Sequence, residues 1–346
     1  MSTIFINGRF LAAPLTGVQR VAFELLKALD DRLISGRGTS LSTADPEFVL
    51  LHPPQTQAPP FKRIRSRQVG NRQGQLWEQI DRPRASAGGM LLNLCNMGPL
   101  LKRDCVTMIH DAQVHTSPRS YSRAFRFWYR FAQPILGRVH RKILTVSSFS
   151  REEIAFVGIA ARDKIAVVPN GCDHILRVNP DDAVVARFGL VPRRYVVSAS
   201  STQHHKNVAV LLSAFADPLL ENETLVLFGS AGRDDFLREG YLVPPNVVFT
   251  GRIDDAAVSG LIGNALCTAW PSLTEGFGLM PLEAMALGCP AVVAPCGALP
   301  EVCADAALQA DPFAPAQWVS RVLELKHDKT LWQRFTEQGR LRAETY

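Results

Sequence analysis

The sequence has no long apolar run and no cysteine-based motif. No stretch of its 346 residues approaches the ~18 consecutive apolar residues of a membrane span, and the start, MSTIFINGRF, lacks the basic and apolar regions of a secretion signal. The 7 cysteines form no Cys-x-x-Cys pair, which argues against a structural zinc site and against a secreted disulfide framework. We therefore expect a cytoplasmic protein with reduced, mostly buried cysteines and no bound metal.

Two functional motifs are also missing. No Gly-x-Gly-x-x-Gly follows the first apolar stretch with an acidic residue about 20 positions later, which argues against a nicotinamide-dependent dehydrogenase. No recognition motif for nucleic acid accompanies the basic residues, so nucleic acid is not an expected partner.

The chain has the length of two domains and an uneven charge. At 346 residues it exceeds the usual size of a single core, and 47% hydrophobic with 20% charged residues is typical of a globular protein. Residues 1–150 hold 21 Lys and Arg against 9 Asp and Glu, whereas residues 151–346 hold 17 against 23. This division into a basic and an acidic half indicates two domains with different partners.

Two segments concentrate the basic residues of the first half. They are FKRIRSRQVGNRQG at 61–74 and the aromatic-rich RSYSRAFRFWYRFAQPILGR at 119–138. Either segment fits contact with an anionic lipid surface, an anionic acceptor or nucleic acid. The alternative is that they are a solvated helix face and a mobile loop.

Short apolar runs alternate with helical patterns along both halves. Strands are expected at 2–8, 47–52, 90–95, 105–111, 142–147 and the start of 164–173, and then at 195–200, 224–230, 246–251, 266–272 and 290–295. Such spacing favours parallel sheets covered on both faces. We predict an α/β protein with two doubly wound, Rossmann-like domains, 1–172 and 173–346. Ligands of such sheets bind outside the carboxyl ends of the strands, so an interdomain cleft is expected.

The stretch TEGFGLMPLEAMALG at 274–288 has a pattern that suggests a ligand site. Pro281 suits the first turn of a helix, which would make Glu283 a first-turn acid, and Gly288 is placed to end that helix. Glu275 precedes the helix, in a loop whose glycines allow close backbone approach to a ligand. The pattern therefore predicts a phosphate-binding loop between two carboxylates, or else only a capped helix.

The same stretch, extended to TEGFGLMPLEAMALGCPAVVAPCGALPEV, resembles glycosyltransferase family 4. VVPNG and HHKN upstream, and the N-terminal NGRFLAAPLTGVQRVAFELL, add to the resemblance, which covers almost the whole chain. It implies a GT-B fold, a nucleotide-diphosphate sugar donor bound by the C-terminal domain, an acceptor bound by the N-terminal domain, and retention of anomeric configuration.

The resemblance also assigns roles to residues of the motif. Glu283 matches the glutamate that binds the ribose hydroxyls of the nucleotide, and Glu275 matches the glutamate that hydrogen-bonds the donor sugar. Phe277, Gly278 and Leu279 match the segment whose backbone amides meet the sugar and the diphosphate.

Lys206 matches the basic residue that neutralises the donor diphosphate. The family usually adds an arginine at one of two nearby positions, which here are His205 and Ser201. A protonated His205 would replace the missing charge; the alternative is an ordinary surface residue.

The first half contributes further candidates by the same resemblance. His110 matches the histidine that faces the donor sugar, and Asp111 would orient its loop or its ring. Gly17 matches the glycine of the N-terminal loop that approaches the phosphates, and Arg20 is a candidate contact to acceptor or phosphate.

The implied reaction is metal-independent transfer of a mannose- or glucose-type hexose, without a cofactor, in which the departing phosphate helps to deprotonate the acceptor. The chain contains no Asp-x-Asp of the kind that holds a metal on the diphosphate. GDP-mannose and UDP-hexoses both fit as donors, and a glycan or lipid-linked oligosaccharide as acceptor, with the protein peripheral on the inner face of the cytoplasmic membrane. The alternatives are an inactive sugar-nucleotide-binding protein and, more remotely, an epimerase or phosphorylase.

Overall fold

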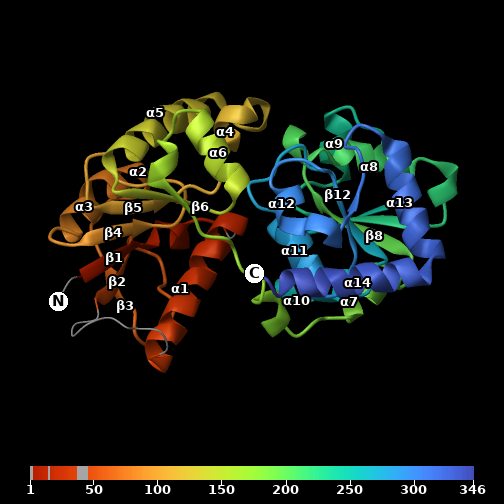
Figure 1. Cartoon of the computed structure of the whole chain (residues 1–346), viewed down its shortest axis with the longest axis horizontal. Coiled ribbons are helices and arrows are strands. Elements are labelled where there is room, and N and C mark those ends of the chain that lie inside the picture. Colours follow the sequence, from red (N-terminus) through yellow and green to blue (C-terminus); the bar gives the residue numbers. More distant parts are fainter. Residues whose placement is uncertain (1–2, 15, 37–45) are drawn as a thin grey trace. The chain divides into compact units, whose positions relative to one another are not determined.

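The computed structural model describes residues 3–14, 16–36 and 46–346 of the chain (Figure 1). They form two compact units: Met1–Thr116 with Tyr121–Val168, and Ser117–Ser120 with Pro169–Tyr346. The chain passes from the first unit to the second at Val168 and Pro169, whereas the prediction placed the domain boundary after residue 172.

The first unit is built on a seven-stranded parallel sheet in the order β3-β2-β1-β4-β5-β6-β7. Its strands are β1 Thr3–Asn7, β2 Glu47–His52, β3 Arg65–Gln68, β4 Met90–Asn93, β5 Cys105–Met108, β6 Lys142–Thr145 and β7 Ile165–Val167. Its helices are α1 Gly17–Ser35, α2 Gly74–Leu76, α3 Arg82–Ala85, α4 Gln113–Thr116, α5 Arg123–Val139 and α6 Ser148–Phe156, and a π-helical turn, Trp77–Asp81, joins α2 to α3.

Alternate residues of each central strand pack on opposite faces of this sheet. Ile6 of β1 and Leu50 of β2 pack against Ala22 and Leu26 of α1. Their neighbours along the strands, such as Phe5 and Leu51, join a cluster on the other face, which includes Ala85 of α3. The two-residue period of a strand thus places apolar side chains on both faces, as a doubly wound sheet requires.

The second unit repeats this plan with six parallel strands in the order β10-β9-β8-β11-β12-β13. They are β8 Tyr195–Ser200, β9 Thr224–Gly229, β10 Val247–Gly251, β11 Cys267–Trp270, β12 Ala291–Val293 and β13 Leu308–Gln309. The helices are α7 Ala183–Arg187, α8 Val208–Phe215, α9 Arg233–Arg238, α10 Asp255–Gly263, α11 Leu279–Ala286, α12 Leu299–Cys303, α13 Pro315–His327 and α14 Lys329–Ala343.

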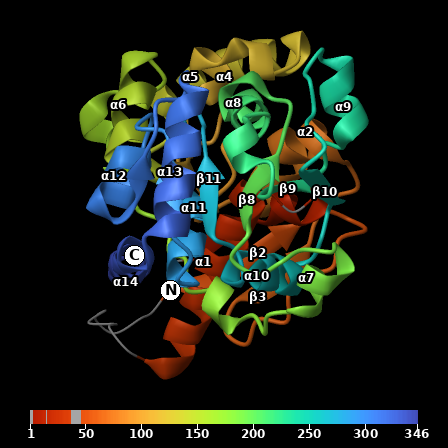
Figure 2. The ribbon, with the colours of Figure 1, turned by 90° about the vertical axis from the view of Figure 1, so that its right-hand side faces the viewer.

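Helices cover both faces of this second sheet (Figure 2). Val196 of β8 packs with residues of α8 and α13, whereas Val197, one position later, packs with residues of α7 and α10. The predicted fold class, two doubly wound parallel sheets, is therefore confirmed.

Two strands were not predicted. β3 lies within the basic segment 61–74, and its four residues are all exposed, so it shows no apolar alternation. Residues 65–68 are thus an edge strand paired with β2 and not the mobile loop that the sequence allowed. β13 has only two residues, too few for a recognisable pattern.

No helix in the described part of the chain is both long enough and apolar enough to cross a membrane. The seven cysteines all lie within the described residues; they are free, and five of them are buried.

Candidate functional site

Two of the predicted site residues meet at the switch point of the second sheet. From β8 the chain runs outward through β9 and β10, and then returns to the other side of β8 as β11. The loops that follow β8 and β11 therefore leave the carboxyl edge of the sheet side by side, where ligands of open α/β sheets bind. Lys206 ends a 3-10 turn after β8, His204–Lys206, and Glu275 lies in the loop after β11.

Lys206 and Glu275 form an ion pair within this edge. The Lys206 Nζ lies 2.7 Å from Glu275 Oε1, and the Ser272 hydroxyl donates to the same oxygen at 2.6 Å. Burial opposes ionisation of Glu275, but the Lys206 charge and the two hydrogen bonds outweigh it, so the pKa of Glu275 lies below its usual value. The site thus presents a carboxylate and an ammonium group at neutral pH.

The loop that carries Glu275 is packed against the loop that follows β12. The Ala298 amide donates to the Glu275 carbonyl at 2.9 Å. Gly297, next to Ala298, has φ +63°, and a Cβ there would lie 2.4 Å from the Glu275 backbone nitrogen. Sequence reasoning did not single out Gly297, and its only signal was its place in the segment APCGALPEV. Only glycine at this position allows the two loops to approach so closely.

Helix α11 has Pro281 in its first turn, as predicted, but not Glu283. Gly278, with φ +104°, precedes its first residue, Leu279, so Pro281 is the third residue and Glu283 the fifth. Glu283 is therefore not a first-turn acid, because the left-handed glycine starts the helix two residues before the proline. Gly288 ends the helix as predicted, with φ +74°.

Glu283 is buried and paired with a histidine. Its Oε1 lies 2.8 Å from His174 Nε2, and the two side chains are 6% and 5% exposed. Because a carboxylate oxygen accepts, Nε2 carries a hydrogen; Nδ1 has no hydrogen-bond partner among the described residues. Sequence reasoning missed His174, which lies in a segment interpreted as a connector, and nothing in the local pattern signals a contact with a residue 109 positions away.

His205 is buried and uncharged in the chain by itself. Burial, together with the nearby charge of Lys206, lowers the pKa of His205 to about 4. The ring is therefore neutral at pH 7 in the chain alone, and protonation of His205 beside a bound diphosphate stays a prediction. Its backbone has a structural role, since its carbonyl accepts from the Leu273 amide at 2.8 Å in the loop after β11.

The remaining motif residues hold the loop in place. The Phe277 ring is buried and packs edge-on against Tyr346, with ring centroids 5.4 Å apart. Gly278 follows Phe277 and precedes Leu279, the first residue of α11. Contact of these backbone amides with a donor stays a prediction.

The other candidates lie in the first unit. His110 follows β5 and is buried, and its Nε2 donates to the Leu94 carbonyl at 2.8 Å. Burial lowers the pKa of His110 to about 4, so its ring is neutral, and Nδ1 holds the lone pair. Asp111 accepts from the Gln113 amide at 2.9 Å, at the start of α4, which agrees with a role in orienting the loop.

Gly17 and Arg20 lie together in the first turn of α1. Gly17 is the first residue of this 19-residue helix and is exposed, with no atom within 4 Å of the place where a Cβ would be. Arg20 is half-buried, and its amide donates to the Thr16 carbonyl at 2.9 Å. Across residues 3–14, 16–36 and 46–346, no three His, Cys, Asp or Glu side chains are grouped as metal ligands.

Comparison with known proteins agrees with the resemblance. The family model of glycosyl transferases group 1 matches residues 188–342. The O-antigen chain mannosyltransferase B of Escherichia coli is 31% identical over 260 residues, which are 70% of this chain and 66% of that protein. The chain spans just under two thirds of the length of this enzyme and of two other mannosyltransferases that it matches, and less of the further curated relatives.

Solved structures share the fold at low sequence identity. WaaG, a glycosyltransferase involved in lipopolysaccharide biosynthesis, is 17% identical with a TM-score of 0.71, over 99% of this chain and 95% of WaaG. Anabaena HepE in complex with UDP-glucose is 17% identical with a TM-score of 0.72, over 100% of this chain and 95% of HepE. The two sheets thus have the GT-B architecture that the sequence resemblance implied.

Proposed function

Because the chain belongs to the glycosyl transferases group 1 family through residues 188–342, we propose that it is a retaining glycosyltransferase. It moves a mannose- or glucose-type hexose from a nucleotide-diphosphate sugar to a glycan or lipid-linked glycan, in the biosynthesis of a surface polysaccharide. The observation that carries this proposal is the Lys206–Glu275 pair at the switch point of the second sheet, in the same unit as the buried Glu283 of α11.

Each group of this site has a task in the proposed reaction. Lys206 neutralises the charge that grows on the diphosphate as the glycosidic bond breaks. Glu275, held ionised by Lys206 and Ser272, accepts hydrogen bonds from hydroxyls of the sugar. The oxygen of Glu283 that His174 does not hold accepts from the ribose, and the departing phosphate takes the proton of the acceptor hydroxyl. The reaction needs neither a metal nor a cofactor.

The donor is GDP-mannose or a UDP-hexose. A mannose donor is supported by the similarity to the E. coli mannosyltransferase, and a UDP-sugar by the similarity to HepE, whose structure contains UDP-glucose. We favour GDP-mannose slightly, because the N-terminal segment resembles O-antigen enzymes.

A thermal-shift screen against GDP-, UDP-, dTDP- and ADP-sugars, without added metal, tests the donor site. One nucleotide class is expected to raise the unfolding midpoint, because a ligand at 100 times its Kd stabilises the folded state by about 2.7 kcal/mol. Glu283→Ala should abolish the shift, whereas Glu324→Gln, which removes a half-buried charge paired with Arg321, should keep it. Equal shifts in wild type and Glu283→Ala would contradict the assignment.

The alternative is a protein that binds nucleotide sugars without transferring the sugar. It is favoured by the neutral His205 where a second cation is usual in the family. Release of nucleoside diphosphate that depends on an acceptor would exclude this alternative. Binding of a donor without any turnover would support it.

His174 is expected to set the affinity for the nucleotide. It holds a buried carboxylate through a charged hydrogen bond, of a kind worth about 1.5–3 kcal/mol, so His174→Ala should weaken nucleotide binding about tenfold or more. His174→Gln can still donate to Glu283 and should retain more affinity. Titration calorimetry with the nucleoside diphosphate measures both, and unchanged affinity in His174→Ala would refute this role.

We also propose that the protein works at an anionic membrane surface. Helix α5 exposes Phe125, Phe127 and Phe131, of which Phe127 is 76% exposed, and the same helix carries exposed Arg123 and Arg130. Basic and aromatic side chains on one helix suit a layer of anionic headgroups, where a lipid-linked acceptor is held.

Flotation with phosphatidylglycerol vesicles tests this surface. Wild type should bind, and added salt should weaken the binding, because each basic side chain near the surface contributes about 1 kcal/mol. Phe127→Ser combined with Phe131→Ser should reduce binding about tenfold, whereas Leu101→Ser, at a residue that is 92% exposed outside α5, should not. Absence of wild-type binding at low salt would rule the surface out.

A further inference from the structure

The first unit contains a cavity whose lining is not used by the site described above. It has a volume of about 510 Å³ and lies where the chain leaves β1 and β2 at the carboxyl edge of the first sheet. Its lining includes Arg9, Pro53, Pro54, Gln55 and Trp77, all from the first unit. A cavity of this size holds a monosaccharide.

The lining combines apolar side chains with polar ones. Pro53 and Pro54 give an apolar surface, and the Trp77 indole N–H is already donated to the Val69 carbonyl at 2.7 Å. Polar atoms come from Gln55 and Gln73, whose side chains meet at 3.3 Å. Arg9 is the charged residue among the lining side chains.

Arg9 belongs to an ion cluster with an excess of positive charge. Its Nη1 pairs with Glu78, which is 1% exposed, and Glu78 also accepts from the buried Arg82 at 3.0 Å. Two guanidinium groups thus share one carboxylate. Arg9 is 32% exposed, whereas Arg82 is fully buried, so Arg9 is the member of the cluster that a ligand can reach. The amide of Gln75 lies beside the Arg9 guanidinium and brings no charge.

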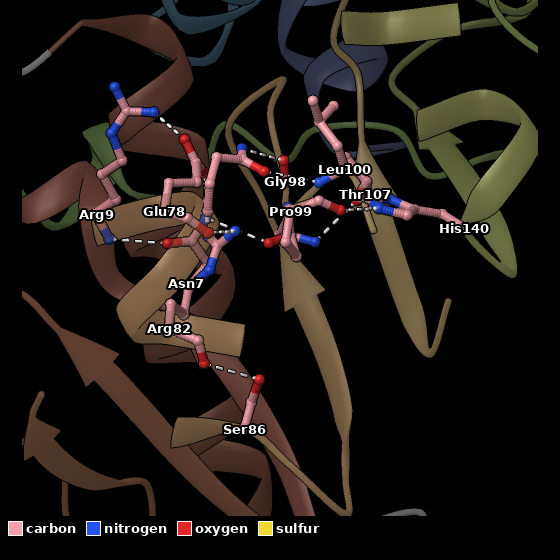
Figure 3. A network of polar contacts seen from close by, with 12 residues as sticks. Asn7, Arg9, Glu78, Arg82, Ser86, Gly98, Pro99, Leu100, Thr107 and His140 are labelled. Atoms are coloured by element: carbon pink, nitrogen blue, oxygen red, sulfur yellow. Dashed lines mark hydrogen bonds and ion pairs between the residues drawn. The ribbon is translucent and has the colours of Figure 1, made fainter. Parts of the chain in front are cut away.

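A network of hydrogen bonds holds this cluster in place (Figure 3). The Asn7 amide donates to Glu78 Oε1 at 3.1 Å and to Asn93 Oδ1 at 3.2 Å, and Asn7 Oδ1 accepts from the Arg9 backbone amide at 3.1 Å. Asn93 in turn donates to the Thr107 hydroxyl at 2.8 Å. The network therefore crosses three neighbouring strands, since Asn7, Asn93 and Thr107 belong to β1, β4 and β5.

The far end of the network is equally fixed. The Thr107 hydroxyl lies 2.7 Å from His140 Nδ1, and His140 Nε2 donates to the Pro99 carbonyl at 2.9 Å. Burial lowers the pKa of His140 to about 4, so the ring is neutral and adds no further positive charge to the network. Arg9 is thus ordered before a ligand arrives, which lowers the entropic cost of binding.

We propose that this cavity binds an anionic sugar, with Arg9 on its carboxylate or phosphate and the two prolines against its ring. A guanidinium suits both anions, because its fork of N–H donors matches two oxygens at once. The binding of an anionic sugar is argued from the cavity alone. The further step, that this sugar is part of the acceptor, rests on the proposed function. The acceptor class is then an acidic or phosphorylated glycan.

Titration calorimetry on the whole chain, without any nucleotide, tests the cavity with glucose, glucuronic acid and glucose 6-phosphate. At least one of the two anionic sugars should bind at least tenfold more tightly than glucose. Binding of glucuronic acid alone assigns a uronate, and binding of glucose 6-phosphate alone assigns a phosphorylated sugar. Equal affinity for glucose, or binding of none of the three, would overturn the proposal.

Variants of Arg9 test whether the anionic sugar binds to this side chain. Arg9→Gln should weaken binding of the anionic sugar at least tenfold, and Arg9→Lys, which keeps a positive partner for Glu78, should retain part of it. Arg162→Gln removes an exposed arginine of the same unit, paired with Glu152, and should change nothing. Undiminished binding in folded Arg9→Gln would also overturn the proposal.

The cavity assignment and the proposed function can fail independently, and the two failures give different results. If the proposed function fails, no nucleotide sugar binds, but the anionic sugar still does. If the cavity assignment fails, nucleotide binding is lost in Glu283→Ala as before, whereas Arg9→Gln has no effect on sugar binding.

Discussion

Replacing Lys206 by methionine is expected to lower turnover about 10²–10³-fold, the usual cost of removing one group that stabilises charge in a transition state. The physical reason is that Lys206 is the cation paired with Glu275 at the switch point, and burial lowers the pKa of the neighbouring His205 to about 4. Lys206→Arg keeps the charge and should lose much less. Release of nucleoside diphosphate is the measurement.

Two controls separate this chemistry from a loss of folding. Lys329→Met, at an exposed position at the start of α14, should leave turnover unchanged.

In Lys206→Met the pKa of Glu275 should rise, because the Lys206 charge is what lowers it most. A carboxylate with a lowered folded-state pKa stabilises the fold above its unfolded pKa and loses that contribution as pH falls. The difference in unfolding midpoint between wild type and Lys206→Met should therefore shrink on acidification. Full turnover in Lys206→Met would contradict the assigned role.

Replacing Gly297 by alanine is expected to damage both stability and donor binding. Alanine at φ +63° is strained, and its Cβ would lie 2.4 Å from the nitrogen and 2.8 Å from the oxygen of the Glu275 backbone. The loop that carries Glu275 must therefore move away from residue 297, which disturbs the position of Glu275. A cost of about 2–4 kcal/mol in the free energy of unfolding corresponds to a midpoint lower by about 5–10 °C.

Gly263→Ala is the matched control for this change. Gly263 ends α10 in the same unit, and a Cβ there would meet no atom within 4 Å. Calorimetry should show an unchanged midpoint in Gly263→Ala and a lowered one in Gly297→Ala, together with weaker binding of the nucleotide sugar. Equal midpoints and equal binding in the two variants would show that the approach of the two loops is not needed.

The sequence predicted the sheets well because strand signals are local. β2 and β8 were expected at 47–52 and 195–200, which are the observed bounds, because their apolar runs are continuous. The Glu275 loop and the glycine that ends α11 were also predicted, since loops and caps depend on neighbouring residues. Pro281 lies in the first turn of α11 as predicted, but the prediction of Glu283 as a first-turn acid was wrong, because the proline rule does not say which position of that turn the proline takes.

The missed residues are those defined by distant contacts. His174 meets Glu283 across 109 positions, and Asn7 meets Glu78 across 71. Neither periodicity nor spacing contains such information, because the contacts exist only after the sheets have formed. The burial of His205 was not predicted for the same reason, since it depends on elements from elsewhere in the chain.

A crystal structure of the protein with GDP, or with UDP if the screen selects it, tests the nucleotide-sugar site most directly. The ribose hydroxyls should lie within hydrogen-bond distance of Glu283, and the diphosphate should lie beside Lys206 at the backbone amides of Phe277, Gly278 and Leu279. A nucleotide bound elsewhere, or one that touches neither Glu283 nor Lys206, would contradict the assignment.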